Sequence, residues 1–393
     1  MNELIIYMFY SLCIILILFY LIFRFKYKFW ILQPVFHYYD ILYWFYNKGI
    51  IQHQLPEKNK YVNLINIRTY NFNELTNSSL LNKFHFFVRK FYFQGKDNYF
   101  DPLYENIIPY FEKHNDITFL SFYNEKKLLR DSSCNIIDSK NIIGVMSSRP
   151  LLIDINKIIF DIYYVDYLCI DSQKRKQGIA PQIIQTHEYN QRHTNPKIRT
   201  SLFKREGELT GIVPLCVYKT YCYEINSINL SVESDPSYKL LVVDKQNIFI
   251  LHDFFKNESK FIIKIYPCIT NLLNLIDSKN IKIFIILKNE QVEGLFFYRK
   301  TCTYINKKEI VCCFASYKSS SLSSSIFVNK FKDSIRQIIS SFHYLSIENI
   351  SDNNVLIKDL QSNYSSIASS PYAYFFYNYA YQTLPPNKVL IIN

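Results

Sequence analysis

The residue types and spacing best suited to chemistry lie between positions 166 and 181. A strand-like run, residues 158–170, leads into a turn with Lys174, Arg175 and Lys176, and Gly178 precedes a helical pattern over residues 181–192. Backbone N–H groups and the positive dipole end at a helix start attract anions, and glycine lets the backbone approach them closely. The basic side chains add charge-assisted hydrogen bonds. The turn predicts a phosphate-bearing ligand, with a solvated basic turn as the alternative.

The last residues of the sequence form a second candidate. Residues 388–392 are strand-like and mainly apolar, and the sequence stops at Asn393. Such a strand would place the α-carboxylate of Asn393 at a fixed position, and a carboxylate with a tuned pKa can act as a general base. The alternative is an ordinary terminal core strand.

The nine cysteines form no metal-binding pattern. They are dispersed and odd in number, without a C-x-x-C pair or metal-ligand spacing with histidine. The simplest interpretation is reduced, mostly buried thiols in a cytosolic compartment. No metal or redox cofactor is expected.

The formal net charge of +12 raises a nucleic-acid interpretation. The basic residues are scattered, however, without a basic arm or an Arg-rich helix. An anionic cofactor or an anionic membrane surface explains the sign equally well, so no nucleic-acid partner is expected. Asn, Ile, Lys and Tyr are abundant, as in AT-rich coding genomes, so a single Lys or Asn is weak support for a site.

The N-terminal segment predicts a membrane anchor. Residues 4–23 carry no formal charge and are long enough to cross a bilayer. Arg24, Lys26 and Lys28 follow, so the positive-inside rule places the rest of the chain on the cytosolic side of a single-pass anchor. No basic stretch precedes the segment and no small-residue cleavage site follows it, which disfavours a signal peptide. A buried core helix is the other alternative.

Hydrophobic periodicity predicts alternating helices and strands. In the first half we expect a helix over 71–92, adjacent strands over 142–146 and 158–170, and a helix over 181–192. Ser, Asp and Pro gather over 231–245, where we place a boundary between two half-domains. The second half predicts strands over 281–287, 293–298, 309–316 and 373–379 and a helix over 327–342. Residues 319–325 are expected to form an exposed, flexible Ser-rich loop.

Three segments carry a resemblance to a known family. They are Lys28-Phe29-Trp30-Ile31-Leu32-Gln33-Pro34-Val35, the pair 166–170 and 175–181, and the C-terminal runs 374–379 and 388–393. In this order and spacing they resemble the eukaryotic N-myristoyltransferases, over about residues 29–393. The resemblance implies an α/β (α+β) fold. Two tandem GNAT-like acyltransferase halves would form one saddle-shaped mixed sheet with flanking helices, preceded by one transmembrane helix. The expected division is an anchor (1–25), an acyl-CoA-binding half (26–235) and a peptide-binding half with the catalytic C-terminus (236–393).

The family's activity implies roles for residues of this chain. A myristoyl group would pass from myristoyl-CoA to the N-terminal glycine amine of a protein or peptide. The α-carboxylate of Asn393 would be the base, and the backbone amides of Tyr167 and Leu168 would form the oxyanion hole. The expected acceptor contacts are Asp166, Thr200 and Tyr377. The expected acyl-CoA contacts are Lys28, Phe29, Trp30, Tyr167, Leu168, Cys169, Ile170, Arg175, Lys176, Gln177, Gly178, Ile179, Ala180 and Pro181.

The sequence also departs from the family pattern. Asp166 stands where the family usually has Asn, Asp171 replaces a usual His, and Gly178 replaces a basic residue. These changes leave two alternatives open. One is a GNAT acyltransferase with another acyl donor or amine acceptor, and the other is a non-catalytic, membrane-tethered protein that binds acyl-CoA or acylated proteins.

Overall fold

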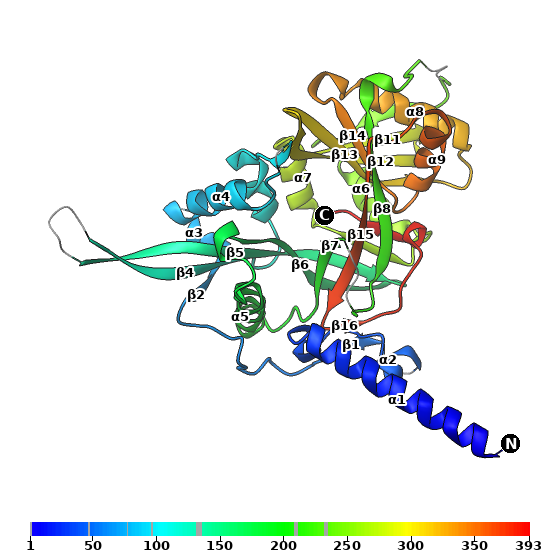
Figure 1. The fold of residues 1–393 in the computed structure, drawn as a ribbon. Coiled ribbons are helices and arrows are strands. Elements are labelled where there is room, and N and C mark those ends of the chain that lie inside the picture. The colour runs from blue at the N-terminus through cyan, green and yellow to red at the C-terminus, as the bar shows by residue number, and fades with distance from the viewer. Residues whose placement is uncertain are drawn as a thin grey trace.

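The structure is a computed structural model that describes residues 2–45, 48–76, 78–95, 97–130, 136–207, 211–231 and 235–393. Cys134 and residues 232–234 of the predicted boundary lie outside the described residues. The described chain is a mixed α/β protein built on one large sheet (Figure 1). The predicted fold class is confirmed.

A fifteen-stranded mixed sheet forms the centre of the molecule. Its main path runs β17-β10-β5-β6-β7-β15-β8-β14-β13-β12-β11-β9, with β2, β3 and β4 joined at its sides. The strands from the first part of the chain are β2 (Ile67–Asn71), β3 (Asn98–Phe100), β4 (Phe119–Arg130), β5 (Ile136–Ile155), β6 (Ile158–Ile170), β7 (Ser201–Glu206) and β8 (Cys216–Glu224).

The later strands are interleaved with the earlier ones. β15 lies between β7 and β8, and β17 reaches β5 through β10. A separate pair joins β1 (Gly49–Ile50) to β16 (Tyr379–Ala380). The remaining strands are β9 (Lys239–Val242), β10 (Ile263–Tyr266), β11 (Ile281–Lys288), β12 (Gln291–Ile305), β13 (Lys308–Lys318), β14 (Tyr344–Glu348), β15 (Ala368–Tyr377) and β17 (Val389–Ile391).

The predicted strand pair over 142–146 and 158–170 is part of a long hairpin. β5 and β6 pair antiparallel through a turn in which Asn156 and Lys157 have φ of 51° and 71°. Two successive positive φ values are typical of the type I′ turns that suit the twist of a hairpin. β4 and β5 continue as a ribbon that extends away from the body (Figure 1). The predicted bounds of β6 are those observed, whereas the prediction over 142–146 covers only part of β5.

The helix expected over 71–92 is two helices. The Asn71 side chain accepts from the Asn73 N–H at the start of α3 (Phe72–Leu75), and the Ser78 side chain accepts from the Leu80 N–H at the start of α4 (Ser79–Phe91). Side-chain capping of this kind starts a new helix and so divides the pattern. The other helices of the body are α5 (Ile179–Thr194), α6 (Phe249–Asn257), α7 (Ile269–Asp277), α8 (Ser324–Arg336) and α9 (Asn353–Asn363).

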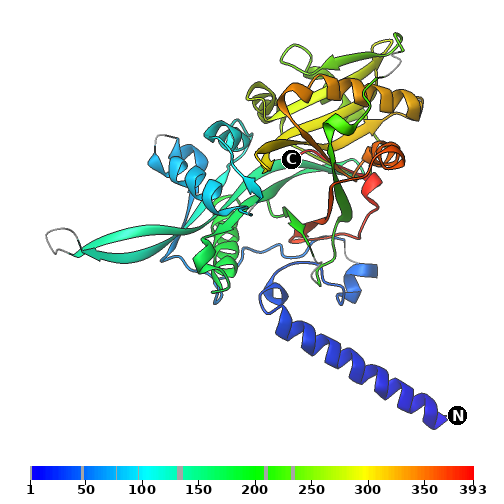
Figure 2. The ribbon, with the colours of Figure 1, turned by 45° about the horizontal axis from the view of Figure 1, so that its top comes forward.

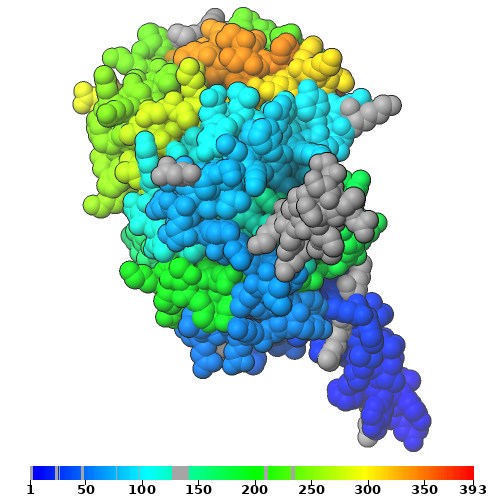
Figure 3. Space-filling model, turned by 90° about the vertical axis from the view of Figure 1, so that its left-hand side faces the viewer, coloured from blue at the N-terminus to red at the C-terminus, as the bar shows by residue number. Residues whose placement is uncertain are grey.

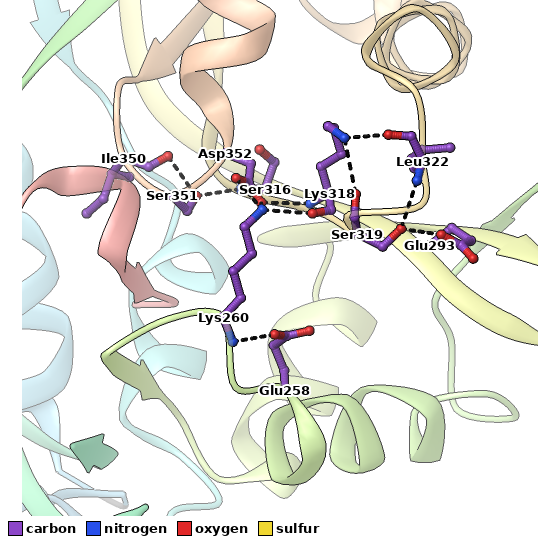
Figure 4. Close-up of polar contacts among 10 residues, drawn as sticks. All are labelled: Glu258, Lys260, Glu293, Ser316, Lys318, Ser319, Leu322, Ile350, Ser351 and Asp352. Carbon is purple, nitrogen blue, oxygen red and sulfur yellow. Dashed lines mark hydrogen bonds and ion pairs between the residues drawn. The ribbon is translucent and has the colours of Figure 1, made fainter. Parts of the chain in front are cut away.

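The Ser-rich loop after β13 is hydrogen-bonded to its surroundings. Ser319 and Ser321 both donate to the Glu293 carboxylate, and Ser323 caps α8 by accepting from the Ile326 N–H at 3.2 Å. Nearby, Lys260 Nζ donates to both oxygens of Asp352 at 2.6 and 2.7 Å (Figure 4). Most of the loop is exposed, as expected, and its serines join it to β12 and to the start of α8.

The N-terminal helix α1 (Asn2–Lys26) stands off the body (Figures 2 and 3). Residues Glu3–Ile22 are long and apolar enough to cross a membrane, and none of that window is buried. Exposure of the whole window is not what a core helix of a soluble protein would show. A 3-10 helix (Trp30–Leu32) and α2 (Ile41–Phe45) connect α1 to the body.

The described cysteines are free thiols. Seven of these eight are buried, and Cys13 on α1 is partly exposed. Burial raises the pKa of several of them, including Cys169 and Cys302, to about 12. The prediction of free and mostly buried thiols is confirmed for the described cysteines.

Candidate functional site

One cavity of about 1070 Å³ brings together segments from the whole chain. The residue at the C-terminus lies in the middle of the molecule (Figure 1). The predicted site residues that line the cavity are Phe29, Trp30, Asp166, Tyr167, Leu168, Ala180, Pro181, Tyr377 and Asn393.

A β-bulge in β6 shapes one wall of the cavity. Val145 pairs with Cys169 and Ser147 pairs with Asp166, so Met146 on β5 faces the two residues Tyr167 and Leu168. Tyr167 has φ of 48°, which a residue with a side chain adopts at a cost. Strain of this kind is concentrated at functional sites. The bulge lies where the sequence places the oxyanion hole.

The Asp166 carboxylate accepts a hydrogen bond from one of the two backbone amides expected to form the oxyanion hole. Its Oδ1 accepts from the Tyr167 N–H at 2.8 Å, and its backbone oxygen accepts from Ser147 Oγ at 2.9 Å. Burial raises the pKa of Asp166 above its usual value, while the positive charge of Arg149 opposes this shift. A carboxyl group is thus held at the position where the family usually has the side-chain amide of Asn.

Two basic side chains of the turn after β6 are bound by residues from other parts of the chain. Arg175 Nη2 donates to the Phe91 backbone oxygen at 2.7 Å, and Lys174 forms an ion pair with Glu125 at 2.7 Å. Gly178 is the N-cap of α5, with φ of 74°. Ala180 and Pro181, in the first turn of α5, line the cavity, whereas the basic turn does not. Cys169, Ile170, Arg175, Lys176, Gln177, Gly178 and Ile179 are outside the lining.

Residues 29–35, which we call the lid, pack on β7 and β15. Trp30 stacks on Phe203 with ring centres 5.6 Å apart. Tyr377 Oη donates to Gln33 Oε1 at 2.7 Å, which joins residues 344 positions apart. Tyr377 therefore holds the lid as well as lining the cavity.

Two predicted contact residues lie elsewhere. Lys28 lines a smaller pocket of about 480 Å³ with Leu21 and Phe25 at the foot of α1. Thr200 is buried, and its backbone oxygen accepts from the Tyr163 N–H at 2.9 Å, whereas the adjacent Ser201 lines the cavity.

Asn393 reaches the cavity because β17 lies parallel to β10 in the interior. The residue is 3% exposed. Its side-chain oxygen accepts from Arg299 Nη1 at 3.3 Å and from Tyr374 Oη at 3.4 Å. The last residue of the sequence is therefore fixed by packing and by its side chain.

A buried glutamate organises the cations of the cavity. Glu348 accepts from Lys204 Nζ at 3.0 Å and from Tyr218 Oη at 2.7 Å, and it also accepts from Arg299 Nη2. Burial alone would raise the pKa of Glu348, but Lys204 and Arg299 outweigh it and hold the pKa at about 2. We call Glu348, Lys204, Arg299 and Tyr218 the Glu348 cluster.

Arg149 is a further cation of the lining. It is 1% exposed, and its guanidinium carbon lies 5.1 Å from the ring centres of both Tyr110 and Tyr164. Within the described parts of the chain, its Nε and Nη1 atoms have no hydrogen-bond partner.

Sequence reasoning missed Arg149 and the Glu348 cluster. Each charged member lies on or at the end of a strand, among apolar residues. A charged residue inside an apolar strand is a usable signal, because burying an unpaired charge is costly. The signal does not say which charges meet.

Metal-ligating side chains do not gather in the part of the chain that the structure describes. No group of three or more His, Cys, Asp or Glu residues there could hold a metal ion.

A bulged strand, a glycine at the start of the next helix and one large mixed sheet surround this cavity. Together they define a mixed α/β fold built around a central cavity. No protein-family model matches the chain, and no curated protein matches its sequence.

Solved structures identify that fold specifically. The chain is similar to Saccharomyces cerevisiae N-myristoyltransferase with bound myristoyl-CoA, with a TM-score of 0.68 and 12% identity over 93% of this chain and 99% of that one. A second structure of that enzyme with myristoyl-CoA gives a TM-score of 0.70, and one with myristoyl-CoA and inhibitors gives 0.67 at 14% identity. The resemblance carried by the three sequence segments is confirmed at the level of the fold.

Proposed function

We propose that this protein is an acyltransferase of the N-myristoyltransferase type, which moves a myristoyl group from myristoyl-CoA to an N-terminal glycine amine. One observation carries the proposal. Within a fold like that of an enzyme solved with myristoyl-CoA, a single cavity contains the lid, the bulge, the start of α5 and Asn393.

The donor would lie between the lid and α5. Phe29 and Trp30 offer aromatic surface for the neutral parts of the thioester, and the N-terminus of α5 offers its dipole to the phosphates. The turn before α5 would add Lys176, whose side chain is exposed.

The reaction would be a direct attack of the amine on the thioester carbonyl. A C–N bond forms, the C–S bond breaks, and the CoA thiolate leaves and takes up a proton. The amides of Tyr167 and Leu168 would stabilise the oxyanion. Because Asp166 holds the Tyr167 N–H, an acceptor ammonium that draws Asp166 toward itself would release this N–H for the thioester oxygen.

The base would be the α-carboxylate of Asn393. β17 and the contacts of the Asn393 side chain fix its position. Positioning of this kind supplies much of the rate when no metal or cofactor takes part. No metal is proposed.

A second candidate function is acyl-CoA binding without transfer. The hydrogen bond from the Tyr167 N–H to Asp166 favours it, because an occupied donor is not available to an oxyanion. Myristoyl-CoA would then bind in the same cavity without turnover.

We also propose that α1 anchors the protein in a membrane, with the body on the cytosolic side. The fully exposed apolar window supports the anchor. Ile41, Leu42 and Phe45 of α2 are also largely exposed beside it, at 67%, 66% and 75%. These side chains would enter the interface next to the anchor.

Full-length protein in detergent, incubated with myristoyl-CoA and glycine-initiated peptides, tests the function. CoA release and peptide mass report transfer, and a variant extended beyond Asn393 is the control. Transfer that disappears in the extended variant supports both the activity and the base. Tight myristoyl-CoA binding without transfer to any peptide would favour the binding protein.

A further inference from the structure

Arg149 is a buried cation of the cavity lining to which the proposed reaction gives no task. Lys204 and Arg299 are satisfied by Glu348, and Arg299 also donates to Asn393. Arg149 has two aromatic rings against its faces and, among the described residues, no hydrogen-bond acceptor for Nε or Nη1. A buried guanidinium of this kind is costly to the folded protein unless an anion meets it.

The strand register places an anion-binding and a cation-binding group side by side. Arg149 on β5 pairs with Tyr164, and Asp166 is two residues further along β6. Residues two apart on a strand share one face, so Asp166 is a diagonal neighbour of Arg149. Asp166 is also one of the expected acceptor contacts and lines the same cavity. Arg149 and Asp166 together suit a ligand whose amine and carboxylate are only a few bonds apart.

The acyl donor does not supply this carboxylate. Its phosphates belong with the start of α5 and the turn before it, and its pantetheine, thioester and acyl chain are uncharged. A planar carboxylate fits the edge of a guanidinium, which offers parallel N–H donors. Of the two proposed substrates, the acceptor is therefore the one that can bring a carboxylate to Arg149.

We infer that the acceptor carries a carboxylate a few bonds from its reactive amine, and that Arg149 binds this carboxylate while Asp166 meets the ammonium. This inference rests on the proposed acyl transfer and names its acceptor class. Two sources have the required chemistry. One is a free amino acid, and the other is a peptide with an acidic residue directly after its N-terminal glycine.

Binding of matched acceptor pairs tests the inference without requiring turnover. Full-length protein in detergent is saturated with a thioether analogue of myristoyl-CoA that cannot transfer its chain. Calorimetry then compares glycine with glycinamide, and two peptides identical except for Asp or Asn after the N-terminal glycine. In at least one pair, the carboxylate form should bind about tenfold more tightly, as for a charge-assisted hydrogen bond. The pair that shows the preference identifies the source.

Substitutions at Arg149 test whether this residue causes the preference for the carboxylate form. Arg149→Gln should bring the two members of the pair to within about twofold, whereas Arg68→Gln, at an exposed arginine on β2, should leave the preference unchanged. Arg149→Lys keeps the charge without the fork and should retain part of the preference, which provides a second variant if Arg149→Gln fails to fold. Equal binding within both pairs in the wild type, or a preference that survives Arg149→Gln, would overturn the inference.

The ligand-free protein gives an independent readout. If Arg149 is kept for a ligand, Arg149→Met should unfold at the same temperature as the wild type or higher, because it removes an unpaired buried charge. A fall of several degrees would show a structural role and contradict the inference. Absence of transfer with myristoyl-CoA would overturn the proposed reaction but would leave the measured carboxylate preference intact, so the two failures are distinct.

Discussion

At the scale of single residues, burial and pairing set opposite behaviour for two glutamates of the cavity. Glu348 is surrounded by donors and has a pKa of about 2. Glu188 on α5 lies 3.8 Å from Arg192, yet burial outweighs this partner and raises its pKa to about 7. The same residue type is therefore ionised at one place and half-protonated near neutral pH at the other.

Glu348→Gln should lower the free energy of unfolding at pH 7 by about 3 kcal/mol, because it leaves Lys204 and Arg299 unpaired. The folded-state pKa lies below the unfolded value of 4.5, so this contribution is present above pH 4.5 and is lost as the pH falls toward 2. Urea unfolding should show that the free energies of unfolding of the two proteins converge over this range. Glu290→Gln, at an exposed glutamate, is the control, and a constant difference down to pH 2 would contradict the assignment.

Glu188→Gln should have the opposite pH dependence. The folded-state pKa lies above the unfolded value of 4.5, so the wild type loses stability as the pH rises from 4.5 through 7. The variant lacks this loss, so its free energy of unfolding should rise relative to that of the wild type by about 3 kcal/mol between pH 4.5 and 8. Unfolding curves at several pH values measure this gain. Glu74→Gln, at an exposed site, should show none, and a pH-independent difference for Glu188→Gln would refute the raised pKa.

At the scale of elements, two backbone features shape the cavity wall. The bulge at Tyr167 turns β6 at the expected oxyanion site, and Gly178 starts α5 in the left-handed region. A Cβ atom added at Gly178 would meet nothing within 4 Å. The requirement for glycine is therefore conformational and not steric.

Gly178→Ala should lower the free energy of unfolding by about 1 kcal/mol, since alanine is strained at positive φ. Gly178→Asn should lose less, because Asn tolerates this conformation. Urea unfolding measures both. Equal losses for Ala and Asn would show that α5 starts in another way.

A hydrogen bond between distant elements helps to hold the lid, together with the Trp30–Phe203 stack. Tyr377→Phe removes the bond to Gln33 and should raise the Kd for myristoyl-CoA about fivefold, the effect of about 1 kcal/mol. Trp30 and Trp44 are the two tryptophans of the chain, so Trp30 fluorescence in a Trp44→Phe background reports binding. Gln33→Leu should give the same loss, and the double variant should add little. Additive losses would mean that the two side chains act separately.

At the scale of the whole molecule, interleaving of distant strands places Asn393 in the centre while α1 remains outside. β15 comes from the end of the chain and pairs with β7 and β8 of the first half, and β17 pairs with β10, which itself pairs with β5. α1 makes no such pairing and presents its apolar surface to the surroundings. The described chain thus places Asn393 at an interior cavity and leaves the apolar window of α1 unburied.

Full-length protein should float with phospholipid vesicles, and the double substitution Ile14→Lys and Leu18→Lys should abolish flotation. Each lysine near the centre of a spanning helix costs about 3 kcal/mol. Ile14→Ala with Leu18→Ala is the matched control and should still float. Vesicle association that survives both lysines would place the membrane contact outside α1.

The sequence by itself determined the local features and their chemistry. Apolar runs predicted β6, β11, β13 and α5, the charge-free segment predicted the exposed helix α1, and three short segments predicted the fold. The division of the helix over 71–92 was missed, because capping by Asn71 and Ser78 depends on local geometry that periodicity does not contain.

Only the tertiary structure decided which residues meet. Arg149, Lys204, Arg299 and Glu348 are separated by tens to hundreds of positions, and strand order alone brings them into one cavity. Each charge is visible in the sequence, but whether it is paired depends on non-local register and burial. That is why the sequence predicted a carboxylate at the end of a strand, but not that Arg149 would line the same cavity with, among the described residues, no hydrogen-bond partner for Nε or Nη1.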